Sequence, residues 1–333
     1  MAYNGGNVPT LLDVAKSENP DGSIATVAEI LTETNEMLLD IPFFEGNLAT
    51  GHRTTVRTGI PAPTWRQFYG GVAPSKSTRA QITDDTAMME AYGLIDKALA
   101  DLSPNLAAFR LSEDYAHIEG MSQAAQRAFI YGNRSTDITQ FNGLAPRYNA
   151  LTGAGNSQNI INAGGVGSDN ASIWLVVWGA QTVHGIYPKG SQAGLQMRDL
   201  GEQTAISSDG NGEFQAYRSH YRWDLGLCVR DWRYAVRIAN IDRSNLTPDL
   251  SGSSANLPDL MFQAIERLPS LNAGIPVFYM DRATRTMFRR QLPNAIKNSS
   301  LEISQVGGVS TYMFQDIPIR RVDEMSPDEA LVS

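Results

Sequence analysis

An abrupt reversal of charge near the start of the chain constrains its fold more than any other feature. Residues 1–45 carry eight acidic side chains and a single lysine, whereas residues 46–83 contain no Asp or Glu at all. The basic side chains of this acid-free segment are Arg53, Arg57, Arg66, Lys76 and Arg79. The segment is also poor in apolar residues and interrupted by Pro and Gly, so it is poorly suited to packing on a core of its own. We therefore predict an extended arm that lies on an acidic partner.

The rest of the composition is that of a folded protein. With 333 residues, 42% of them hydrophobic and 19% charged, the chain can form one large or two moderate domains. Its net charge of −8 argues against sequence-independent binding to nucleic acid or to anionic membranes. The longest apolar run, residues 173–178, is far shorter than a membrane span of about 20 residues. Because no secretory signal is visible and Cys228 is the only cysteine, we expect folding in a reducing cytoplasm.

Hydrophobic spacing and turn residues predict the elements of the first hundred residues. Apolar residues at three-four spacing predict a helix within residues 10–40. β-branched residues at 52–58 and 78–83 predict the two strands of a long hairpin, whose tip is punctuated by Pro and Gly. The aromatic side chains of this tip are Trp65, Phe68 and Tyr69. Residues 84–101 fit a helix or, over 86–95, a strand, and the sequence leaves both open.

A long uninterrupted helix is the clearest element of the sequence. Ser103 and Pro104 form a cap followed by a first-turn proline, and Gly132 supplies a stop signal. Together they predict a helix over 104–131. At about 1.5 Å per residue it would be about 42 Å long, which is typical of a strut rather than of an ordinary domain helix.

The remainder of the chain mixes strands and helices without a regular β-α-β repeat. We expect mostly loop over 132–170, including a glycine-rich stretch at 153–167. Predicted strands lie at 172–179, 182–187, 214–241, 276–280, 301–306 and 312–322. Predicted helices lie at 257–268 and 283–291. This mixture favours the α+β fold class.

The sequence contains no pattern typical of catalysis, cofactor binding or metal binding. The four histidines, His52, His117, His184 and His220, lack the spacing of metal ligands. Cys228 lies in an alternating apolar run, which is typical of a buried and inert thiol. The glycine-rich stretch lacks both the lysine and the preceding strand of a phosphate-binding loop. We therefore predict no enzyme activity, no catalytic residue, no cofactor and no metal.

Two further patterns leave alternatives open. Arginines within 214–241 alternate with aromatic residues. This fits a charged strand face that pairs with acidic side chains such as Asp224 and Asp231, contacts between subunits, or stacking on single-stranded nucleic acid. Lys76 could form an isopeptide bond with an asparagine of a neighbouring subunit. The sequence identifies neither that asparagine nor an assisting carboxylate, so a surface salt bridge is the default interpretation.

Four local sequences carry a resemblance to a known family. They are MEAYGLIDKALADL (89–102), AFIYGN (128–133), FNGLAPRY (141–148) and DIPIRRVD (316–323). Together with the order of acidic arm, basic extended loop, long helix and β-rich domain, they resemble the major capsid protein of tailed bacteriophages. That resemblance implies an α+β, Hong Kong 97-like capsid fold. It also implies a structural protein that assembles into an icosahedral head around double-stranded DNA.

The resemblance further implies a division of the chain and a set of partners. The segments would be an N-terminal arm at 1–45, an extended β-hairpin loop at 46–83, a peripheral domain at 84–144 with the spine helix at 104–131, an axial domain at 145–275, and a return to the peripheral domain at 276–333. Copies of the chain would form hexamers and pentamers, with a separate scaffolding protein, a portal and a cement or decoration protein. The head would assemble in the host cytoplasm, away from membranes, and enclose DNA without sequence-specific binding.

The charge reversal then has a specific interpretation, contact between subunits. The predicted contact residues of the extended loop are Arg53, Arg57, Trp65, Arg66, Phe68, Tyr69, Lys76 and Arg79. The predicted contact residues of a neighbour's N-terminal arm are Glu29, Glu33, Glu36, Asp40 and Glu45. Two alternatives stay open, a cellular nanocompartment shell of the same fold and a carbohydrate-binding surface protein. The second would use Trp174, Trp178, Trp223 and Trp232.

Overall fold

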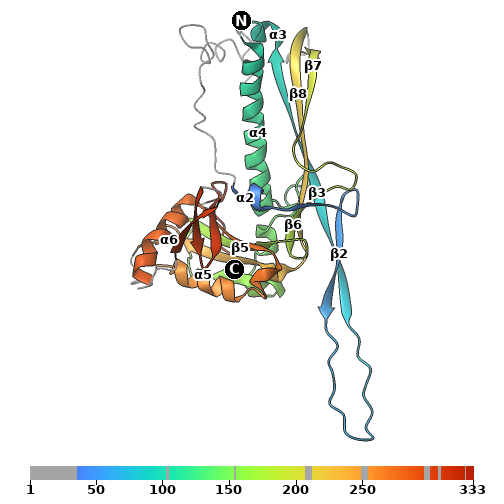
Figure 1. Cartoon of the computed structure of the whole chain (residues 1–333), viewed down its shortest axis with the longest axis vertical. Coiled ribbons are helices and arrows are strands. Elements are labelled where there is room, and N and C mark those ends of the chain that lie inside the picture. The colour runs from blue at the N-terminus through green and yellow to red at the C-terminus, as the bar shows by residue number, and fades with distance from the viewer. Residues whose placement is uncertain are drawn as a thin grey trace.

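The architecture is taken from a computed structural model of the chain. It describes residues 36–102, 105–153, 155–206, 212–248, 254–295, 301–306, 309–326 and 328–333. The molecule consists of a compact body, a long helix beside long strands, and a narrow hairpin that extends beyond both (Figure 1). Most of the predicted helix within 10–40 lies outside the described residues. The described part of it is the short helix α2 (Glu36–Asp40).

The predicted hairpin is present and grows directly out of the main sheet. Strand β2 (Gly51–Gly59) pairs antiparallel with the first half of β3 (Thr78–Asp96), and the second half of β3 pairs with β8 (Glu213–Val229). Residues 84–96 are therefore strand, and the short helix α3 (Lys97–Ala100) follows them. The strand is favoured over a helix because β8 supplies a register partner for residues 86–96, and β2 pairs with Asp84 and Asp85.

The long helix α4 (Leu106–Tyr131) confirms the predicted strut. Its 26 residues span about 39 Å. The helix ends where the Gly132 amide donates a hydrogen bond to the Ala128 carbonyl at 2.9 Å, and the predicted cap at 103–104 lies outside the described residues. Strands β3 and β8 run beside α4 (Figure 1). No helix in the described part of the chain is both long and apolar enough to cross a membrane.

Two strands of the sheet differ from the sequence-based prediction. Strand β7 (Gln196–Ile206), which pairs with β8, was not predicted, because it is largely polar and a bulge interrupts its alternation. The predicted strand over 214–241 is two strands, β8 and β9 (Ala235–Asp242). The tight turn Trp232–Tyr234 separates them, and the side chain of Asp231 caps this turn.

The remaining elements complete one large mixed sheet with helices on the body. The other described strands are β1 (Phe43–Glu45), β4 (Ile160–Asn162), β5 (Asn170–Trp178), β6 (Val183–Tyr187), β10 (Ile275–Met280), β11 (Leu301–Val306), β12 (Val309–Phe314) and β13 (Ile317–Arg321). The other described helices are α5 (Leu257–Glu266) and α6 (Arg282–Ala295), with short 3-10 turns at Ala145–Arg147, Gly155–Asn159 and Leu271–Ala273. The main strand order is β11-β12-β13-β10-β5-β6-β8-β3-β2. The predicted α+β class is confirmed.

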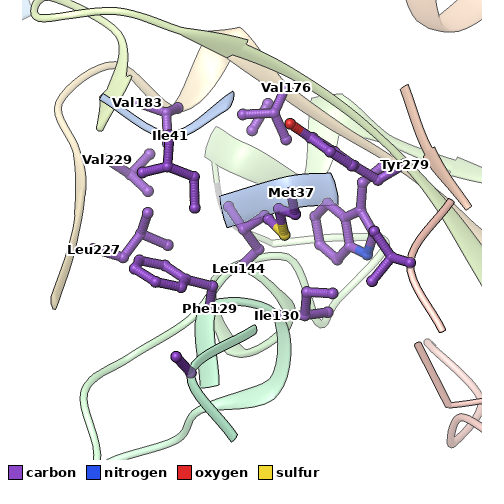
Figure 2. Packing of buried hydrophobic residues seen from close by; sticks show 14 of the residues in the cluster. Met37, Ile41, Phe129, Ile130, Leu144, Val176, Val183, Leu227, Val229 and Tyr279 are labelled. Carbon is purple, nitrogen blue, oxygen red and sulfur yellow. The ribbon is translucent and has the colours of Figure 1, made fainter. Parts of the chain in front are cut away.

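Strand β5 is buried along its whole length because it lies between two hydrophobic cores. Alternate residues from Ile173 to Val177 face α5 and α6, whereas those from Trp174 to Trp178 face α2 and the end of α4. Figure 2 shows the second core, in which Met37 of α2 lies among side chains of α4 and of the strands. This packing fixes the start of the described chain on the body.

The strand pairing groups the chain differently from the predicted boundaries at 145 and 276. Strands β7 and β8 lie with β3 and α4, although they fall within the predicted axial segment 145–275. Strands β10 to β13 are joined to one another and, through β10, to β5, although they fall within 276–333. Only the last residues return to α4, where the Tyr131 hydroxyl donates to Glu329 at 2.6 Å. The predicted boundaries are approximate, and the division of the chain into peripheral and axial parts stays a prediction.

Candidate assembly interface

The tip of the hairpin carries large apolar side chains that the described part of the chain leaves uncovered. Trp65, Phe68 and Tyr69 are 101%, 94% and 105% exposed, and Ile60 is 84% exposed. Single exposed apolar residues are common on proteins, but a cluster of them on a narrow projecting arm is typical of an interface. The structure thus brings the three predicted aromatic contacts together and adds Ile60, which the sequence analysis did not single out.

The turn at the tip holds one of these aromatic residues in an unfavourable backbone conformation. The Gly70 amide donates a hydrogen bond to the Gln67 carbonyl at 3.1 Å, which closes a tight turn. Tyr69 occupies its third position with φ of 64°, a conformation that favours Gly or Asn. A residue with a side chain costs about 1–2 kcal/mol in this left-handed conformation. A contact of its exposed ring with another molecule would offset that cost.

The predicted cations of the hairpin are exposed and have no acidic partner in the described part of the subunit. Arg57 lies directly opposite Arg79 in the register of β2 and β3, and like charges at such positions repel each other. Arg53 lies opposite Thr83, and its Nε donates to Thr83 Oγ1 at 3.3 Å. No ion pair to a described residue is formed by the hairpin's five cations, Arg53, Arg57, Arg66, Lys76 and Arg79. An acidic surface on another molecule would relieve this uncompensated charge.

The base of the hairpin, in contrast, is fixed to the body. Asp85 forms an ion pair with Arg134, and the buried Asp84 forms one with Arg147 at 2.8 Å. Asn47 holds β2 from the side, because its Oδ1 accepts from the Arg53 amide at 2.7 Å and its Nδ2 donates to the Arg53 carbonyl at 2.8 Å. Sequence reasoning missed these anchors, since no local pattern links residues so far apart. The body therefore sets the direction of the arm.

Asp40 is bound inside the subunit rather than presented to a neighbour. Its Oδ1 accepts a hydrogen bond from Arg320 Nη2 at 3.1 Å, and its Oδ2 accepts from the Tyr279 hydroxyl at 3.0 Å. Trp178 Nε1 donates to the same hydroxyl at 2.7 Å, which extends the network into the core. Burial and the charge of Asp40 raise the pKa of Tyr279 well above its usual value, so the phenol remains a donor. Asp40 thus ties α2 to β10 and β13.

We expect Asp40→Asn to destabilise the isolated subunit by about 1–3 kcal/mol, because charge-assisted hydrogen bonds contribute about that much. Urea unfolding of unassembled protein would measure the loss. Arg282→Gln is a suitable control, because its ion pair with Asp323 is at the surface, with the arginine side chain 71% exposed. Unchanged subunit stability with impaired assembly would instead show that Asp40 acts between subunits.

The other predicted acidic contacts fall into two groups. Glu36 accepts a hydrogen bond from the Arg321 amide at 3.0 Å, and Glu45 accepts one from the Gly190 amide at 2.9 Å. Both therefore have partners in their own subunit. Glu29 and Glu33 lie outside the described residues.

Two of the arginines that alternate with aromatic residues pair with carboxylates of their own subunit. Arg222 pairs with Asp224 at 3.0 Å, and Arg233, which follows β8, pairs with Asp231 at 2.7 Å. The charged strand face paired with acidic side chains, one of the three alternatives, is therefore confirmed for these residues. The guanidinium of Arg218 lies over the Tyr92 ring, 5.3 Å from its centre.

The tryptophans considered for carbohydrate binding are not arranged as a binding surface. Trp174, Trp178 and Trp223 are buried, and Trp232 packs against the same core. Sugar binding needs exposed ring faces, so the carbohydrate alternative built on these residues is wrong. Trp174 and Trp178 lie on β5 and Trp223 lies on β8, whereas Trp232 lies in the turn after β8.

A comparison with family models decides what kind of protein carries this arm. Residues 19–333 match the model described as Major capsid protein GP7. The chain belongs to this family. It is a major capsid protein of a tailed-phage head, a structural component of the virion that assembles with copies of itself into a shell, and not an enzyme. Family membership also decides against the cellular nanocompartment.

Several solved structures are similar to this chain. A chain in the cryo-EM structure of bacteriophage Epsilon15 is 34% identical, with 100% of both chains covered and a TM-score of 0.78. This similarity confirms the predicted Hong Kong 97-like fold. The bacteriophage JBD30 capsid is 10% identical over 96% of this chain and 99% of the other, with a TM-score of 0.47. The holo-SrpI encapsulin complex from Synechococcus elongatus PCC 7942 is 12% identical over 69% and 95%, with a TM-score of 0.46. No curated protein matches the chain.

Proposed function

We propose that the β2–β3 hairpin is the arm by which one capsid subunit holds the next. The observation that carries this proposal is the uncovered aromatic tip on an arm whose base is anchored and whose cations are unpaired. Trp65, Phe68 and Tyr69 would enter an apolar site on a neighbour, and the cations of the arm would meet its acidic side chains. Because Asp40 is engaged in its own subunit, Glu29 and Glu33 remain the predicted acidic partners from the N-terminal arm.

The proposed assembly consists of hexamers and pentamers of this chain in an icosahedral head. We assign α4 with β3, β7 and β8 to the peripheral part of the capsomer, and the body with α5 and α6 to the axial part. A separate scaffolding protein, a portal and a cement or decoration protein would complete the particle, which would form in the host cytoplasm. The net charge of −8 fits a shell that encloses double-stranded DNA without binding it tightly.

Replacing Arg53 and Arg57 together with Glu should reduce particle yield at least tenfold. The change reverses the charge of the arm, so attraction to an acidic neighbour becomes repulsion. The subunit should stay folded, because both side chains are exposed. Negative-stain microscopy and sedimentation of the expressed protein would measure the yield.

Arg198→Glu with Arg290→Glu provides the control, because it makes the same change in net charge at two exposed positions away from the arm. It should assemble normally. Normal particle yield from the Arg53 and Arg57 double variant would contradict the proposed role of the arm.

A further inference from the structure

Two histidines and the single cysteine, far apart in sequence, meet at the base of the hairpin. His52 on β2, His184 on β6 and Cys228 on β8 place their nitrogen and sulfur ligand atoms within 4.8 Å of one another. His184 and Cys228 lie directly opposite each other in the register of β6 and β8. The rings of His52 and His184 are 6.0 Å apart between their centres. Sequence spacing gave no sign of this cluster because three separate strands assemble it.

The cluster contains a buried ligand atom that nothing in the described chain satisfies. His184 is 3% exposed, and its buried Nδ1 has no hydrogen-bond partner among the described residues. Leaving such a nitrogen unpaired is unfavourable, because no hydrogen bond compensates for its removal from water. A buried imidazole nitrogen of this kind is a common metal ligand. Cys228 is fully buried, whereas the half-buried His52 leaves an approach from solvent.

A buried carboxylate beside the cluster supplies negative charge. Asp84 is 2% exposed and lies directly opposite His52 in the register of β2 and β3. Its Oδ1 pairs with Arg147, while its Oδ2 has no hydrogen-bond partner in the described part of the chain. This carboxylate would attract a bound cation, and a metal-bound thiol is deprotonated.

We propose that His52, His184 and Cys228 form a zinc-binding site that ties the hairpin to the body. Two imidazoles and a thiolate are preferred zinc ligands, and water or a carboxylate can complete the tetrahedron. Bonds of about 2.0–2.3 Å place tetrahedral ligand atoms about 3.3–3.8 Å apart, so the cluster must contract by about 1 Å. His52 can supply this movement. Its Nδ1 accepts a long hydrogen bond of 3.3 Å from the Asn47 amide, which a metal bond through that atom would replace.

A bound metal ion would make the base of the hairpin more rigid, whether or not the arm contacts another subunit. His52 belongs to the arm, whereas His184 and Cys228 belong to strands of the body. A metal ion shared by them would cross-link β2 to β6 and β8 at the point where the arm leaves the sheet. The proposal therefore does not depend on where the tip of the arm binds.

Zinc content of the purified full-length protein tests the proposal. The protein is stripped with a chelator, loaded with zinc chloride and desalted, and the metal is counted by mass spectrometry. We expect about one zinc per chain, and with Co²⁺ in its place the charge-transfer absorption of a cobalt–thiolate bond. Zinc should also raise the thermal unfolding temperature, because it binds the folded chain preferentially.

Variants identify the ligands. His52→Gln should lower zinc affinity at least tenfold and abolish the thermal shift, with an unchanged circular dichroism spectrum. His220→Gln, whose ring stacks on Tyr92 away from the cluster, should bind zinc as the unaltered protein does. His52→Gln is preferred to a Cys228 variant because its half-buried site tolerates a polar side chain. Two results would overturn the proposal. One is that the unaltered protein retains no more zinc than His52→Gln does, and the other is that its Co²⁺ complex lacks the thiolate absorption.

Discussion

Replacing Trp65, Phe68 and Tyr69 together with alanine should abolish shell assembly while leaving the subunit folded. These side chains are almost completely exposed in the subunit, so their removal takes no packing from it. Truncating a single buried aromatic anchor at an interface costs about 2 kcal/mol or more. Even one such loss is a factor of about 30 in the equilibrium constant of each contact. Because a shell repeats the contact at every subunit, so large a loss should leave only unassembled protein.

The matched control changes the same three residues but keeps an aromatic side chain at each position. It combines Trp65→Phe, Phe68→Tyr and Tyr69→Phe, and it should still form shells in electron micrographs and sediment as particles. The alanine variant should instead sediment as free subunits with a normal circular dichroism spectrum. Normal shells from the alanine variant would show that the tip of the arm makes no essential contact.

Replacing Glu329 with alanine should destabilise the subunit by about 3–5 kcal/mol, because it leaves a buried arginine without its counterion. The carboxylate of Glu329 accepts a hydrogen bond from Arg237 Nη2 at 2.7 Å, and both side chains are 5% exposed. Tyr131 donates to the same carboxylate from the end of α4, and Ser172 donates to it from β5. Urea unfolding of unassembled subunits would measure the loss.

Two further variants separate the charge effect from a loss of packing. Glu324→Ala is the matched control, because its ion pair with Arg127 spans 3.6 Å and the arginine side chain is 64% exposed. We expect a loss of less than about 1 kcal/mol from it. The double variant Arg237→Met with Glu329→Leu removes both buried charges and should recover part of the stability lost in Glu329→Ala. A Glu329→Ala loss no larger than that of Glu324→Ala would contradict this account.

The parts of the fold that could be predicted are those with local sequence signals. The hairpin was predicted because Pro and Gly separate two β-branched runs, and α4 because no proline or turn signal interrupts its apolar spacing. The aromatic residues of the tip were identified because an extended arm cannot bury them itself, so they are expected to contact another molecule. For residues 84–96 the sequence alone left helix and strand open, since the deciding partner, β8, is more than a hundred residues away.

The parts that could not be predicted depend on pairing across the chain. In the sequence, Asp40 is indistinguishable from the other acidic residues of the N-terminal arm. In the structure, Arg320 and Tyr279 bind it inside the subunit. The opposition of Arg57 and Arg79 follows from strand register, which composition does not reveal.

Strand β3 has a mechanical consequence for the shell. The same continuous strand pairs with β2 in the arm and with β8 beside α4, and no loop separates the two halves. Any swing of the arm must therefore twist or bend a hydrogen-bonded strand at Asp84 and Asp85, where ion pairs to Arg147 and Arg134 resist it. The arm therefore resists bending at its base, because no flexible hinge joins it to the sheet. A force that a neighbouring subunit applies at the tip is therefore transmitted along β3 to β8 and α4 of the same subunit.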